Sequence, residues 1–157
     1  MADNYFDTVV TLEFDKNQGD IPEAVSQRFQ HMGSVFRWMA EDSDSVENEL
    51  IELALEVGVV TDKQAVSDLT EYLDGETDQP EALYDCYSAE KWLMCLREHG
   101  CIAVKVEDLY SCSKRRPFEH SVGIAVAAWD TENQKMVSFN SYSDIAKILG
   151  IPHTAIL

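Results

Sequence analysis

Apolar and polar residues alternate in several parts of the chain, which predicts strands. Val10, Leu12 and Phe14 share one face of an extended segment, with polar residues between them, and a period of two is typical of a half-buried strand. A later segment is apolar on both faces, as expected for a central strand, and the strand after it completes a hairpin. We expect strands at residues 8–14, 101–106, 122–129 and 135–140.

Elsewhere apolar residues recur at helical spacing, with signals for helix starts and ends. Asp20 with Glu23 is typical of a helix start, and Gly58, Gly75 and Gly100 are typical of helix ends. We expect helices at residues 20–39, from 44 or 45 to 57, at 61–74, at 78–99 and at 144–149.

Together these patterns predict one α+β domain over residues 1–157. We expect about five helices packed on a small, mostly antiparallel sheet of three or four strands. Residues 1–100 should be mainly helical, and residues 101–157 should be rich in strands with a closing helix.

Charge is concentrated in one segment. Residues 41–85 carry fifteen carboxylates and one cation, Lys63, so they hold a charge of −14 out of −17 for the whole chain. Because apolar residues are interleaved at helical spacing, we expect folded amphipathic helices with an acidic side, not an unfolded tail. This charge repels phosphate backbones and anionic membranes and attracts a basic protein, so we expect no direct binding to nucleic acid or membranes.

The carboxylates are spaced to form rows on the expected helices. Glu49, Glu52 and Glu56 stand at positions i, i+3 and i+7, which places neighbours about 5 to 6 Å apart on one helix side. Like charges at this spacing cost a few tenths of a kcal/mol each, so either the row binds a partner or it is a solvated face that serves solubility or adaptation to high salt. The expected partner-binding residues are Glu49, Glu52, Glu56, Asp68, Glu71, Asp74, Glu76 and Asp78.

This placement of charge over residues 41–85 resembles the acidic proteins by which phages and other mobile elements block restriction or CRISPR machinery by mimicking DNA. The resemblance has no sequence motif. It implies a non-enzymatic inhibitor that binds a basic nucleic-acid-binding protein, such as a bacterial defence nuclease or a CRISPR-type complex, and competes with DNA or RNA. An acidic adaptor within a larger assembly fits the same pattern.

The alternative is an enzyme. Cys86, His120 and Asn140 follow one another in an order that resembles the core of papain-like and transglutaminase-like enzymes. That resemblance implies a peptidase, deamidase or transferase in which a thiolate attacks an acyl carbon, a histidine moves the proton, and Asn140 or Asp144 orients the histidine. However, the expected helix starts near Pro80, which puts Cys86 on its buried stripe and not in its first turn, where the helix dipole would lower the thiol pKa.

Cysteine usage and the start of the chain bear on compartment and cofactors. We expect a cytoplasmic protein, in the host cell if phage-encoded, because no export signal follows Met1 and no apolar run is long enough to cross a bilayer. The four cysteines should therefore be reduced. Cys95 and His99 share a helix face, but no CxxC pair is present, so we expect no metal site and no cofactor.

Overall fold

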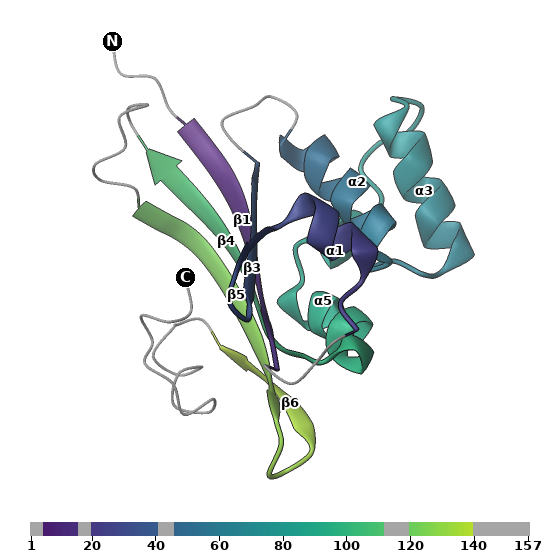
Figure 1. Ribbon diagram of the computed structural model, residues 1–157. Coiled ribbons are helices and arrows are strands. Elements are labelled where there is room, and N and C mark those ends of the chain that lie inside the picture. Colours follow the sequence, from purple (N-terminus) through teal and green to yellow (C-terminus); the bar gives the residue numbers. More distant parts are fainter. Residues whose placement is uncertain (1–4, 16–19, 41–45, 112–119, 140–157) are drawn as a thin grey trace.

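An antiparallel sheet organises the fold (Figure 1). The computed structural model describes residues 5–15, 20–40, 46–111 and 120–139. Within these residues the sheet has six strands in the order β2-β3-β1-β4-β5-β6. The strands are β1 (Tyr5–Phe14), β2 (Gln30–Met32), β3 (Val35–Ala40), β4 (Cys101–Ser111), β5 (His120–Asp130) and β6 (Lys135–Phe139). The predicted α+β domain is confirmed, but the predicted number of strands was too small.

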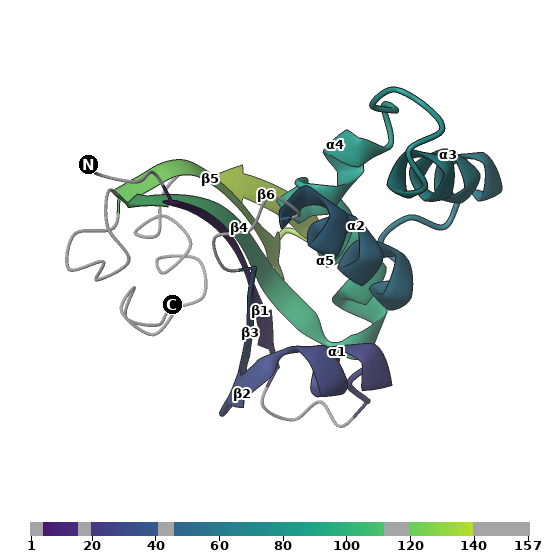
Figure 2. The same cartoon turned by 90° about the horizontal axis from the view of Figure 1, so that it is seen from above.

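Five helices lie on one side of this sheet (Figure 2). They are α1 (Glu23–Arg28), α2 (Val46–Val57), α3 (Lys63–Leu73), α4 (Leu83–Cys86) and α5 (Ala89–Leu96). A 3-10 turn, Arg97–His99, leads from α5 into β4. In both views α3 lies outside α2, farther from the sheet. The helical layer is thus two helices deep at this point. No helix of the described part is long and apolar enough to cross a membrane.

The two faces of the sheet differ in chemistry. Val10 and Leu12 of β1 belong to the core cluster with α2 and α5, whereas Val9 and Thr11 point to the opposite face because side chains alternate along a strand. All four residues are buried. The segment predicted as a half-buried strand is therefore buried on both faces, and its second face carries polar residues.

The helix predicted over residues 20–39 is wrong beyond Arg28. After α1 the chain forms the β2–β3 hairpin, which turns at Gly33 with a left-handed φ of 67°. Six residues of β3 then pair with β1. Phe36 and Met39, which had helical spacing in the sequence, lie on opposite faces of β3. Pairing with β1 satisfies the backbone of β3, and this tertiary contact overrides the local pattern.

The single helix predicted over residues 78–99 is also wrong. The chain forms α4 and α5 with a break at Tyr87 and Ser88. Ser88 caps α5 by accepting a hydrogen bond from Lys91 N at 3.3 Å, and Trp92 Nε1 donates to Cys86 O at 2.9 Å. These two bonds satisfy backbone groups that a continuous helix would have used.

The other predicted helices and strands within the described residues agree with the structure. The helices predicted up to 57 and over 61–74 correspond to α2 and α3, and Asp62 is the N-cap residue of α3. The predicted strands correspond to parts of β1, β4, β5 and β6, and the hairpin between β5 and β6 is present. The predicted closing helix at 144–149 lies outside the described residues.

Candidate functional site

The outer side of α2 carries the row of three glutamates. Leu50, Ile51, Leu53 and Ala54 of α2 are fully buried. Glu49, Glu52 and Glu56 lie on the other side of the helix and are exposed. The packed side therefore fixes the direction in which the acidic row points.

One cation contacts this row. Arg28 of α1 places Nη2 2.5 Å from Glu56 Oε2, and both side chains are exposed to a similar degree. An exposed ion pair of this kind contributes little to stability. It does lower the charge at the end of the row that lies nearest α1.

The carboxylates of α3 have different surroundings from one another. Glu71 is exposed, whereas Asp68 is half-buried and accepts a hydrogen bond from Gln64 Nε2 at 2.8 Å. Asp74 is the C-cap residue, and the last turn of α3 contains no basic residue. A negative charge at the carbonyl end of a helix is unfavourable, so Asp74 is not placed for helix stability.

A groove separates α3 from the segment that leads into α4. Its volume is about 690 Å³, and its apolar lining comes from Ala65, Pro80 and Ala82. Four carboxylates line it, two from each side: Asp62, Asp68, Glu81 and Asp85. Of the predicted contact residues, only Asp68 lies in this groove, while Glu76 and Asp78 are exposed in the segment after α3.

Tyr84 lies on α4, between two residues of this groove. Its side chain is 76% exposed, while its neighbours on α4, Leu83 and Cys86, are buried. The sequence carries no signal for the exposure of Tyr84, because its pattern predicts one long helix through this segment. Tyrosine is enriched at protein interfaces relative to the rest of the surface, which makes Tyr84 a candidate contact residue.

Cys86 lies in surroundings that disfavour its thiolate. It is the last residue of α4, its side chain is fully buried, and burial together with the charges of Asp85 and Glu47 raises the pKa of its thiol to about 12. A nucleophilic cysteine needs the opposite, a lowered pKa and access to substrate. The side chain of His120 and the whole of Asn140 lie outside the described residues.

Thiols, imidazoles and carboxylates are the side chains that could bind a metal ion in this chain. Cys86, Cys95 and Cys101 are free thiols, while Cys112 lies outside the described residues. Within the described part of the chain, no group of three or more Cys, His, Asp or Glu side chains is arranged to hold a metal ion.

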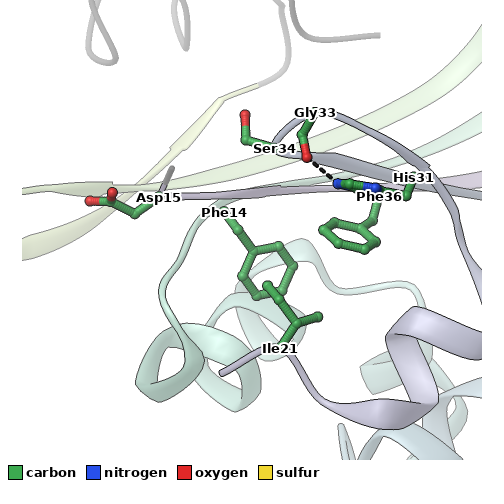
Figure 3. A pocket seen from close by; sticks show the side chains of 7 residues that line it. All are labelled: Phe14, Asp15, Ile21, His31, Gly33, Ser34 and Phe36. Carbon is green, nitrogen blue, oxygen red and sulfur yellow. Dashed lines mark hydrogen bonds between the residues drawn. The ribbon is translucent and has the colours of Figure 1, made fainter. Parts of the chain in front are cut away.

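A smaller pocket of about 280 Å³ lies where β1, β3 and the start of α1 meet (Figure 3). The His31 ring stacks on Phe36 at 4.6 Å, and Phe36 meets Phe14 edge to face at 5.3 Å. Ile21 completes the apolar lining, and Figure 3 shows the Asp15 carboxylate directed away from these rings. The pocket is mainly apolar, and its one carboxylate, Asp15, does not point toward the rings.

Comparisons with protein-family models, with curated proteins and with solved structures found no match to this chain.

Proposed function

We propose that the protein is an acidic inhibitor that binds a basic, nucleic-acid-binding protein and competes with DNA or RNA for it. The contact surface, called the acidic surface below, consists of Glu49, Glu52, Glu56, Asp68, Glu71, Asp74, Glu76 and Asp78. The observation that carries the proposal is the exposed row of glutamates on α2, a helix whose opposite side is locked into the core.

The rigidity of α2 matters because nucleic acid presents its phosphates at regular spacing. Glu49, Glu52 and Glu56 are held about 5 to 6 Å apart by the helix. A groove lined with Arg and Lys that normally binds phosphates could accept carboxylates held in such a row. A flexible acidic tail would have to lose conformational entropy before it bound in the same way.

The distribution of charge supports binding more than stability. Residues 46–85, which the structure describes, carry twelve carboxylates and one cation, Lys63. A surface selected for solubility alone mixes charges of both signs. Here the negative field is left almost uncompensated, which speeds the encounter with a basic partner.

Tyr84 and the groove beside it add a second kind of contact. A guanidinium group from the partner could stack on the Tyr84 ring while Glu81 or Asp85 pairs with its charge. Tyrosine is one of the residue types that often carry a large share of the binding energy at interfaces. We therefore expect Tyr84 to contact the partner beside the carboxylates of α3.

The partner class that follows from the resemblance in charge placement is a bacterial defence nuclease or a CRISPR-type guide complex. The protein, immobilised through its N-terminus, should retain such proteins from a bacterial lysate at low salt, and mass spectrometry identifies them. Duplex DNA or single-stranded RNA added at constant salt should then release them. Retention that nucleic acid does not reverse would contradict competition as the mechanism.

A further inference from the structure

A row of polar side chains crosses the centre of the sheet on the face opposite the helices. Arg37 of β3 stands directly opposite Thr11 of β1, and Thr11 stands opposite Lys105 of β4. Directly opposed residues point to the same face, with Cβ atoms about 4.5 to 5.5 Å apart. The register therefore places one hydroxyl group between two cationic side chains on three neighbouring strands.

Thr11 and Lys105 of this row are buried, Arg37 is partly buried, and carboxylates flank the row. Thr11 is 2% exposed and Lys105 is 3% exposed. Glu13 and Glu107 lie two residues along β1 and β4, on the same face. Glu13 Oε1 accepts a hydrogen bond from Ser34 Oγ at 2.8 Å, and Glu107 Oε1 lies 3.8 Å from Lys105 Nζ, which is longer than a direct hydrogen bond.

Two buried donors in the row lack an acceptor. Thr11 Oγ1 and Arg37 Nε have no hydrogen-bond partner within the described part of the chain, and neither does Oε2 of Glu13, whose Oε1 accepts from Ser34. Buried groups of this kind are rare in folded proteins and cost about 1 to 3 kcal/mol each. Because an arginine Nε can only donate, the missing group at Arg37 is an acceptor.

We propose that this row is a binding site for a small oxyanion, a phosphate or a carboxylate group. Its oxygens would accept hydrogen bonds from Arg37 Nε and Thr11 Oγ1, and Lys105 would supply a second positive charge. The planar guanidinium of arginine suits such groups geometrically. The site lies on the opposite side of the sheet from the acidic surface. The proposed anion binding is therefore independent of the proposed inhibitor function.

The electrostatics of Lys105 agree with this assignment. Burial, and then the charge of Arg37, lower the pKa of Lys105, which lies at about 8 although Glu107 acts in the opposite direction. A negative charge added beside the desolvated Lys105 would favour its charged form, in the same direction as Glu107.

Thermal unfolding near pH 7 tests the site. Sodium sulfate and sodium acetate, the probes for a tetrahedral and a planar oxyanion, are each compared with sodium chloride at equal ionic strength. At about ten times the dissociation constant, the binding anion should raise the Tm of the wild type by roughly 2 to 5 °C in a saturable manner. A shift with sulfate alone assigns a phosphate-like ligand, and a shift with acetate alone assigns a carboxylate.

Two variants separate specific binding from the general stabilisation that sulfate gives to proteins. Arg37→Gln should lose the saturable shift, whereas Lys63→Gln, which removes an exposed cation on α3, should keep it. If Arg37→Gln does not fold, Thr11→Val serves instead, because it removes the hydroxyl while nearly keeping the shape, and it should weaken anion binding about tenfold. Equal shifts in the wild type, Arg37→Gln and Thr11→Val, or no shift beyond chloride, would mean that only water occupies the row and would overturn the proposal.

Discussion

The outer surface of the helical layer and the helix-free face of the sheet use charge in opposite ways. On α2 and α3 every charged side chain except Lys63 is a carboxylate, and most of them are exposed. On the sheet, charges of both signs are buried within two residues of one another, as with Lys105 and Glu107. An unpaired charge on the surface costs little free energy because water solvates it. A buried charge costs much more unless an opposite charge or a hydrogen bond lies close to it. The comparison indicates that the first region is open to a macromolecular partner and that the second can hold only a small one.

The largest expected effect is the slow alkylation of Cys86, which lies on the buried side of the helical layer. The pKa of Cys86 lies at about 12, compared with 9 for an ordinary thiol. Its thiolate is thus about a thousandfold rarer near neutral pH, and burial blocks the reagent as well. Iodoacetamide should alkylate Cys86 at least about a thousandfold more slowly in the native protein than in urea, as followed by peptide mapping. Rapid and selective labelling of native Cys86 would favour the cysteine enzyme.

A second prediction concerns the buried charges of the sheet. Lys105 has a folded-state pKa of about 8, below the unfolded value of 10.5. The unfolded chain therefore binds more protons between these pH values, and the contribution of Lys105 to stability rises with pH across this window. Relative to Lys105→Met, the wild type should gain up to about 3 kcal/mol of unfolding free energy between pH 7 and pH 10.5.

Urea unfolding of both proteins in chloride buffer measures this difference and cancels the titration of shared groups. Lys63→Met, which replaces an exposed lysine in the same way, provides the control for the substitution itself. Parallel stability curves for the wild type and Lys105→Met would show that burial does not shift the pKa of Lys105. That result would contradict the difference between exposed and buried charges described above.

A third prediction concerns Tyr84 on the exposed side of the helical layer. Tyr84→Ala should weaken binding to a basic partner about tenfold, because an aromatic contact at an interface commonly contributes 1 to 2 kcal/mol. Its Tm should not change, since the ring is 76% exposed. Met94 of α5 is 63% exposed, so Met94→Ala is the matched control and should bind like the wild type. Equal affinities for both variants would remove Tyr84 from the interface.

The smallest expected effect belongs to Arg28. Its ion pair with Glu56 is exposed, so Arg28→Ala should change the free energy of unfolding by less than about 1 kcal/mol. Binding to a basic partner at low salt should become a few-fold tighter, because Glu56 is then free to contact it. Calorimetric titration detects this, and weaker binding would indicate that Arg28 itself contacts the partner.

Local pattern predicted much of the fold, but it failed where tertiary contacts decide. The alternation in β1 and the ends of α2 and α3 at Gly58 and Gly75 were readable from the sequence. The β2–β3 hairpin was not, because its apolar residues also fit a helix and only pairing with β1 decides between the two. The break before α5 left one signal, Ser88 ahead of an apolar run, which is typical of a helix N-cap.

Part of the candidate site could likewise be predicted from local pattern, and part depends on tertiary contacts. The exposure of Glu49, Glu52 and Glu56 follows from helical phase once the apolar side of α2 is known. The acidic groove could not be predicted from the sequence. It lies between α3 and a segment whose pattern predicts part of one long helix. The polar row could not be predicted either, since Thr11 and Lys105 are distant in sequence and meet only through the β1–β4 register.

Charge reversal measured against salt tests the acidic surface most directly. The triple variant Glu49→Lys, Glu52→Lys, Glu56→Lys is compared with a control that reverses three exposed glutamates outside residues 41–85, namely Glu23, Glu98 and Glu132. Both change the net charge equally. The inhibitor account predicts that the α2 variant loses affinity for a retained basic partner by at least about a hundredfold at low salt, while the control loses far less and keeps the steep decline of affinity with salt. Equal losses in both variants would mean that net charge, and not the row on α2, drives binding, and would contradict the account.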